Sequence, residues 1–188
     1  MKSTKKMIIT GMFAAVIAIL AQISIPLPSG VPITLQTFAV ALTGAVLGAK
    51  LGTLATLIYI LLGAVGVPVF AGLKGGLGVI VGKTGGFIWG FLFLALLCGI
   101  GASMKQKAAG WMPGILGLAV CHVLGVAQFA VLTGMGLWEG ALLVSVPYLL
   151  KDICSVALAY VLGLQVKKQL YRASFLDAPT SEKKAQKI

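Results

Sequence analysis

The stretch that decides the fold runs from Met7 to Ala49, MIITGMFAAVIAILAQISIPLPSGVPITLQTFAVALTGAVLGA, and carries no formal charge. Pro26, Pro28 and Pro32 fall near its middle. Proline ends helices because it lacks the backbone N–H and clashes with the preceding turn. The two halves, residues 7–25 and 33–49, each approach the length of about 20 apolar residues that a membrane-crossing helix needs. The stretch therefore predicts two transmembrane helices joined by a turn.

Four further apolar stretches follow along the chain. They are residues 51–73, 84–104 and 108–138, which lack formal charge, and residues 140–166, in which Lys151 and Asp152 are the only charged side chains. Each is long enough to cross a bilayer. For the last stretch, the alternative is two shorter buried segments separated at Lys151 and Asp152.

The composition excludes a soluble domain. Hydrophobic residues make up 59% of the 188-residue chain and charged residues 10%, whereas a soluble domain carries about 25% charged residues. We expect an all-α integral membrane protein, with a single six-helix membrane domain over residues 1–172. Residues 173–188 are polar and charged, and they are expected to form a disordered cytoplasmic tail.

The basic residues set the predicted topology. A cytoplasmic N-terminus and six spans place twelve of the fifteen Lys and Arg residues inside, namely Lys2, Lys5, Lys6, Lys50, Lys105, Lys107, Lys167, Lys168, Arg172, Lys183, Lys184 and Lys187. Cytoplasmic loops of membrane proteins carry such an excess. Both termini are therefore predicted to be cytoplasmic, and the net charge of +11 needs no nucleic-acid partner to explain it.

A glycine-rich segment, Ala71–Gly86, joins the third and fourth predicted spans on the outer side. Its backbone could fold tightly and re-enter the helix bundle, which is tolerated at membrane depth only where it lines protein or a water-filled cavity. One interpretation is a structured outer lid. The other is a flexible loop whose glycines merely allow a turn.

Asp152 is the most informative residue of the sequence. It lies fifteen positions before Lys167, about 22 Å along a helix, which places it in the outer third of the membrane. A carboxylate within a membrane is by default a functional residue that faces the bundle interior and has a partner. The alternative is a structural ion pair with Lys151, Lys83 or Lys74.

Other polar and aromatic side chains outline an outward-facing pocket with Asp152. The candidate ligand-binding residues are Thr34, Gln36, Lys83, Trp89, His122, Gln128, Tyr148, Lys151 and Asp152. Lys83 and Lys74 at the rim favour a small amphipathic anion as the ligand. The three cysteines and the single histidine show no metal-ligand spacing, so no metal site is predicted.

Two alanines on the first predicted helix, Ala14 and Ala18, form a small-x-x-x-small pair. Such a pair lets another helix approach closely. That helix could belong to a partner protein or to the same chain.

Three motifs resemble a known family when taken together. They are the Ile23–Gln36 run ISIPLPSGVPITLQ, the stretch from Gly75 to Phe91 that contains GKTGGFIWGF, and PYLLKD at 147–152. The chain resembles BioY, the biotin-specific substrate-binding (S) component of energy-coupling factor (ECF) transporters. The resemblance extends to about Val166.

The resemblance implies a function and a set of partners. A BioY protein captures biotin on the outer side of a prokaryotic cell membrane with high affinity, uses no cofactor and catalyses no reaction. It associates with a transmembrane coupling protein (T component) and two ABC-type ATPases, and an alanine motif on its first helix, matched here by Ala14 and Ala18, contacts the coupling protein. Family-like binding positions fall on the Gln36 turn, the glycine-rich loop and Asp152.

Two departures from the family pattern concern the ligand's carboxylate. Relatives commonly have proline where this chain has Lys83, and often have lysine where it has Ser155, which leaves Lys151 and Lys83 as alternative partners. An S component for thiamine, riboflavin or niacin is the alternative function. A membrane enzyme or a channel is a weaker one, because the sequence shows no paired acid and base groups and no polar rings.

Overall fold

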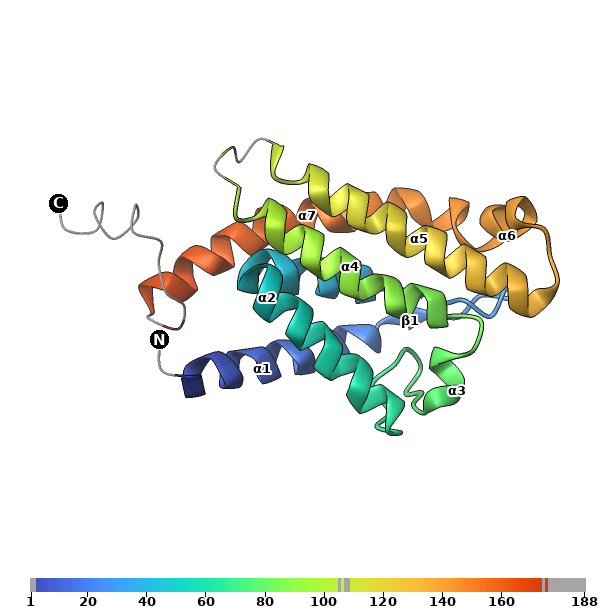
Figure 1. Cartoon of the computed structure of the whole chain (residues 1–188), viewed down its shortest axis with the longest axis horizontal. Coiled ribbons are helices and arrows are strands. Elements are labelled where there is room, and N and C mark those ends of the chain that lie inside the picture. Colours follow the sequence, from blue (N-terminus) through green and yellow to red (C-terminus); the bar gives the residue numbers. More distant parts are fainter. Residues whose placement is uncertain (1–2, 105, 107–108, 174, 176–188) are drawn as a thin grey trace.

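The computed structural model describes residues 3–104, 106, 109–173 and 175. Its elements in chain order are α1 (Ser3–Ala21), β1 (Ser24–Ile25), β2 (Ile33–Thr34), α2 (Gln36–Ala64), α3 (Leu77–Ile80), α4 (Gly85–Gly101), α5 (Met112–Thr133), α6 (Leu137–Val144) and α7 (Val146–Arg172). Figure 1 shows a bundle of long helices in which the start of α1 and the end of α7 lie at one end. The strands, α3 and α6 lie at the opposite end.

Four of these helices are long and apolar enough to cross a membrane by length and composition: α1, α2, α5 and α7. The apolar helix α4 is shorter, with 17 residues. Many large hydrophobic side chains remain exposed on the outer faces of these helices, as expected for a surface in contact with lipid. The prediction of a helical membrane protein is confirmed, while the count of six spans stays a prediction.

The second and third predicted spans correspond to two helices that together make up α2 and meet at a sharp kink rather than at a loop. Gly48 has φ 80° and ψ 172° inside α2, in a backbone region that is essentially restricted to glycine. The expected boundary at Lys50 is therefore two residues from the actual bend. No turn residues intervene, so the chain resumes its helix at once.

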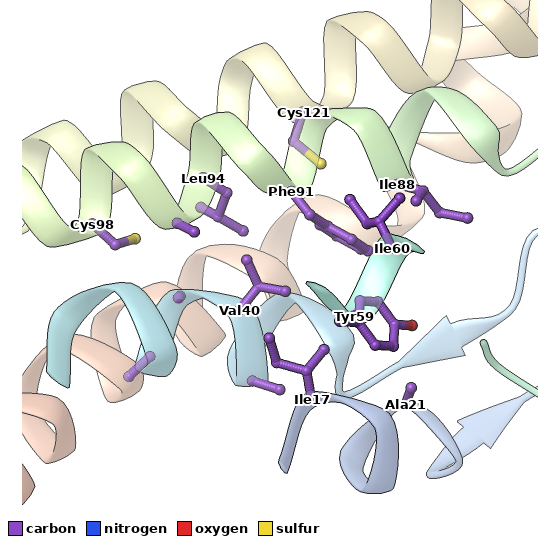
Figure 2. Packing of buried hydrophobic residues seen from close by; sticks show 14 of the residues in the cluster. Ile17, Ala21, Val40, Tyr59, Ile60, Ile88, Phe91, Leu94, Cys98 and Cys121 are labelled. Carbon is purple, nitrogen blue, oxygen red and sulfur yellow. The ribbon is translucent and has the colours of Figure 1, made fainter. Parts of the chain in front are cut away.

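The core lies where α2 and α4 cross and where α4 packs on α5. Figure 2 shows Ile17 and Ala21 of α1 meeting Tyr59 of α2, with side chains of α4 above them. Gly44 of α2 lies against the backbone of Ala95 of α4, and a Cβ there would overlap the Ala95 carbonyl oxygen. Small residues let membrane helices approach this closely, because packing rather than the hydrophobic effect holds them together.

The proline-rich turn between α1 and α2 forms a short antiparallel ribbon that the sequence did not predict. Ser24 pairs with Thr34, and Ile25 pairs with Ile33. Backbone N–H and C=O groups near the prolines cannot join a helix, and the pairing gives some of them hydrogen-bond partners. The expectation that the first helix reaches Ile25 is corrected accordingly, because α1 ends at Ala21.

The last predicted span is divided at Ser145 rather than at Lys151 and Asp152. Ser145 ends α6 and precedes α7, which then continues without interruption to Arg172. Pro147 lies in the first turn of α7, where proline is accommodated because the first N–H groups of a helix have no partner within it. The predicted start at Gly140 and end at Val166 are thus both corrected.

The alanine pair of α1 lies inside the fold. Ala14 is 2% exposed and belongs to the main core, and Ala18 packs against that core. In this structure they serve packing within the chain, and the small residues that α1 leaves exposed are Gly11 and Ala15. Contact between Ala14 or Ala18 and a partner protein stays a prediction that this arrangement does not favour.

The predicted disordered tail, residues 173–188, falls mostly outside the described residues. Ala173 closes α7 through hydrogen bonds from its backbone N–H to the carbonyl oxygens of Gln169 and Tyr171.

Candidate functional site

A pocket opens at the end of the bundle that is remote from the chain termini. Its empty space, including the part open to solvent, is about 730 Å³. Its walls come from the proline-rich turn, the start of α2, the loop between α2 and α4, and the helices α4, α5 and α7. Segments distant in the sequence therefore meet around one cavity.

Asp152 lies in this pocket and is 5% exposed. Its Oδ1 atom forms an ion pair with the ammonium nitrogen of Lys151 at 2.5 Å, and apart from this contact Oδ1 is a buried oxygen without a hydrogen-bond partner. The ion pair offsets the carboxylate's charge, while lone pairs of Oδ1 stay available. The pocket thus contains an acceptor suited to N–H or O–H donors of a ligand.

Lys151 links Asp152 to the proline-rich turn. Its ammonium group donates a hydrogen bond of 2.9 Å to the backbone carbonyl of Thr34. The ammonium group therefore bonds the turn while its charge lies beside Asp152. The structural ion pair that the sequence left as an alternative is present, and it lies inside the pocket.

Tyr148, one turn before Lys151 and Asp152 on α7, holds the same turn at a second point. Its hydroxyl donates to the carbonyl oxygen of Val31 at 2.6 Å and lies 3.4 Å from the hydroxyl of Ser29. Tyr148 is buried and lines the pocket. The turn is therefore fixed from α7 as well as by its own hydrogen bonds.

His122 of α5 completes the polar centre. Its Nε2 atom is 3.3 Å from Oδ2 of Asp152, and its Nδ1 atom is 2.8 Å from the hydroxyl oxygen of Ser145. Both His122 and Ser145 are buried. The sequence singled out His122, but it gave no sign of Ser145 as its partner.

Gln36 and Thr34 lie where the ribbon enters α2. The Gln36 side-chain amide donates to the hydroxyl of Tyr59 at 2.6 Å, and its backbone N–H donates to the Thr34 hydroxyl at 3.2 Å. Tyr59 lies in the main core. Gln36 is thus oriented by a residue from the far half of the same kinked helix.

Apolar side chains cover the rest of the pocket wall, and most were missed from the sequence. They are Val31, Phe70, Val79, Phe87, Ile88, Phe91 and Val144. Phe87 and Phe91 are four residues apart on α4 and share a helix face. The predicted Trp89, midway between them, points elsewhere and is 44% exposed. Helical periodicity could have distinguished the two faces.

The loop between α2 and α4 is a structured wall of the pocket. Gln22, just after α1, donates to the carbonyl of Val69 at 3.1 Å and accepts from the N–H of Leu73 at 2.9 Å. Leu73 has φ 55°, a left-handed conformation that strains a non-glycine residue. Its N–H is held by Gln22, so the strained residue is fixed to the end of α1.

Gln128 of α5 holds the other end of this loop. Its amide nitrogen donates to the carbonyl oxygens of Ile80 and Gly82 at 3.0 and 2.8 Å. It does not line the pocket. Gln128 is therefore an anchor of this loop, while a lid on the outer side stays a prediction.

The predicted binding residues divide into two groups. Six of them, Thr34, Gln36, His122, Tyr148, Lys151 and Asp152, line one pocket. Lys83, Trp89 and Gln128 lie outside the pocket lining, and Lys83 is exposed beside Gly30. Lys74, expected at the rim with Lys83, does line the pocket.

The chemistry of the pocket is that of binding. It offers a buried carboxylate, two ammonium groups, amide and hydroxyl groups, and aromatic walls. Within the described ranges, no group of three or more His, Cys, Asp or Glu side chains could hold a metal ion. The arrangement suits a small molecule with an apolar body and a few hydrogen-bonding groups.

Comparison with known proteins assigns the chain to a family. The model of the BioY family matches residues 1–172. The chain belongs to the BioY family. The biotin transporter BioY of Thermotoga maritima is 42% identical over 166 residues, which cover 87% of this chain and 96% of that protein. The probable biotin transporter BioY of Pyrococcus horikoshii is 37% identical over 159 residues, 85% of this chain and 94% of that protein.

A solved structure supports the BioY fold. It is the crystal structure of the S-component for biotin from an ECF-type ABC transporter, with a TM-score of 0.80 and 23% sequence identity. The match covers 89% of this chain and 93% of that one. This BioY protein therefore shares the fold of an S component, and its family consists of transporters rather than enzymes.

Proposed function

We propose that this protein captures biotin on the outer face of a prokaryotic cell membrane, as the S component of an ECF transporter. The observation that carries the proposal is the Asp152 oxygen that lies buried in an apolar pocket without a hydrogen-bond partner. Membership of the BioY family indicates biotin as the ligand. Biotin fits this pocket because it combines a ureido ring with N–H groups, an apolar ring system and a carboxylate.

Each part of biotin has a matching wall. The ureido N–H groups donate to Oδ1 of Asp152, since an ionised carboxylate accepts but cannot donate. The fused rings pack against Phe87 and Phe91, which line the same cavity. The carboxylate meets a lysine at the mouth, and Lys74 and Lys151 are the lysines that line the pocket among the described residues. Binding uses no cofactor.

Membrane topology follows from the two halves of α2. Residues 36–47 and 49–64 are about 18 and 24 Å long, and with α1, α4, α5 and α7 they give six membrane segments. Both halves are shorter than a core of about 30 Å, and the proline-rich turn adds depth to the first half, which is the shorter. Non-helical backbone is tolerated there because it lines a cavity. Both termini are then cytoplasmic and the pocket faces outward.

Energy for uptake comes from partner proteins. The chain would dock on a transmembrane T component that carries two ABC-type ATPases. The exposed small residues of α1, Gly11 and Ala15, with open space around Gly11, give a helix of that component a place to approach.

Equilibrium binding tests the proposal directly. The full chain, purified in detergent or nanodiscs, should bind labelled biotin at low-nanomolar concentrations, and unlabelled biotin should displace it. Competition by thiamine, riboflavin and niacin measures specificity. Absence of displaceable biotin binding by folded protein contradicts the proposal, and tighter binding of another vitamin would assign that vitamin instead.

A further inference from the structure

A chain of buried polar side chains runs from the junction of α6 and α7 to the pocket. Ser145 contacts Nδ1 of His122 at 2.8 Å, and Nε2 of His122 contacts Oδ2 of Asp152 at 3.3 Å. The three residues are 8%, 6% and 5% exposed. They come from the helix junction, α5 and α7, so their meeting is a product of the tertiary fold.

The chemistry of these groups fixes where the histidine proton lies. An ionised carboxylate only accepts hydrogen bonds, so Nε2 of His122 must carry a proton to bond Asp152. In the neutral imidazole, Nδ1 is then an acceptor, and the Ser145 hydroxyl donates to it. The carboxylate therefore selects the histidine tautomer, and the Ser145 hydroxyl stabilises it by donating to Nδ1.

The surroundings hold each member of the chain in place. Ser145 ends α6, with its N–H bonded to the carbonyl of Ala141, and its own carbonyl accepts from the N–H groups of Tyr148 and Leu149 at the start of α7. The ring of Phe87 packs edge-on against the His122 ring, with centroids 5.8 Å apart and an interplanar angle of 88°. The imidazole is thus fixed by packing as well as by its two hydrogen-bonding atoms.

The two oxygens of Asp152 consequently have different roles. Oδ2 is occupied by His122, whereas Oδ1 has no hydrogen-bond partner. The terminal torsion of an aspartate is broad and roughly two-fold, so without His122 only the ion pair between Oδ1 and Lys151 would restrain the carboxylate. With His122 in place, one oxygen is held and the other is presented.

We propose that His122 is a positioning residue for ligand recognition: Ser145 orients its imidazole, and the imidazole holds Asp152 so that Oδ1 faces the N–H donors of the ligand. This inference rests on the proposed function for the identity of the ligand. It assigns to the single histidine of the chain a role that acts through Asp152 rather than by contact with biotin.

A double-mutant cycle measures this role. His122→Phe keeps an aromatic ring but removes the donor, and it should weaken biotin binding about 10- to 100-fold, as expected for loss of a hydrogen bond to a charged group. His122→Gln retains an N–H that can reach Asp152 and should restore most of the affinity. In an Asp152→Asn background, His122→Phe should change affinity by no more than about two-fold, because its partner is already altered.

The cycle has clear contrary results. Equal losses from His122→Phe in both backgrounds would mean that His122 acts independently of Asp152, and wild-type affinity in His122→Phe would mean that it does not act on binding at all. Thermal unfolding of each variant identifies a general loss of stability, which Gln would not selectively rescue.

Nitrogen-15 NMR of the histidine-labelled wild-type protein tests the proton assignment without any variant or ligand. Because the chain has one histidine, its signals need no assignment. A protonated Nε2 is expected, and Ser145→Ala should shift the Nδ1 signal. A neutral tautomer protonated on Nδ1 would overturn the inference, even if biotin binding is confirmed. A neutral tautomer protonated on Nε2 would support it, even if another ligand proves correct.

Discussion

Gln22, just after α1, gives the sharpest test of how the loop between α2 and α4 closes one side of the pocket. Gln22 joins α1 to this loop by one hydrogen bond to the Val69 carbonyl and one from the Leu73 N–H. Gln22→Ala removes both. Because Phe70, Ala71 and Lys74 of the same loop line the pocket, we expect faster release of biotin from the variant.

The magnitude follows from the two lost bonds. Each contributes about 0.5–1.5 kcal/mol net, so the loop loses roughly 1–3 kcal/mol of its attachment. The left-handed conformation of Leu73 adds a strain that favours opening once its N–H is free. If biotin leaves only when the loop opens, its dissociation rate should rise by about 30-fold, within limits of roughly 5- and 150-fold.

The assay is a chase of bound labelled biotin with excess unlabelled biotin, followed over time. Gln165→Ala, which alters an exposed glutamine of α7, is the matched control. A dissociation rate within about two-fold of wild type in folded Gln22→Ala would refute the argument, as would an equal increase in the control.

Three further substitutions test other parts of the structure. Tyr148→Phe removes the donor to Val31 and should weaken biotin binding by about five-fold in equilibrium titrations, the effect of one neutral hydrogen bond; an unchanged affinity would show that the turn is held by other contacts. Gly48→Ala should lower the free energy of unfolding by about 1–3 kcal/mol, because alanine is strained at φ 80°. Its thermal midpoint should lie well below that of the control Gly78→Ala, where a Cβ meets open space. Equal midpoints would contradict this account. Lys74→Gln should weaken binding of biotin by up to about five-fold. It should leave the affinity for biotin methyl ester unchanged, because the ester lacks the carboxylate. An equal loss of affinity for both ligands would exclude a charge interaction.

Much of the fold could be predicted because apolar length and the placement of charge carry the information. The charge-free run from Met7 marked two membrane segments, and the carboxylate of Asp152 was recognisable because so few acidic residues occur in such surroundings. The bend of α2 was harder, because one glycine with an unusual φ leaves no turn signature. The break at Ser145 had a signal in Pro147, since helices tend to end before the residue that precedes a proline.

The site was only partly predictable because its contacts depend on tertiary structure. His122 and Ser145 are 23 residues apart, and Gln22 meets Leu73 across 51 residues. No local pattern specifies such pairs. Gln128 was correctly seen as polar within an apolar helix, but only the structure shows that it bonds the loop rather than facing the pocket.

The hold of α7 on the proline-rich turn determines where this protein can tolerate sequence change. Tyr148 and Lys151 bond the carbonyl oxygens of Val31 and Thr34, and every residue type supplies a carbonyl. Replacement of Val31 by another apolar residue should therefore preserve the hydrogen bond from α7. Replacement of Tyr148 or Lys151 should not, because the side chain of each is itself the donor. In a saturation mutagenesis screen for biotin uptake, substitutions in the turn should therefore be tolerated more often than substitutions of Tyr148 and Lys151.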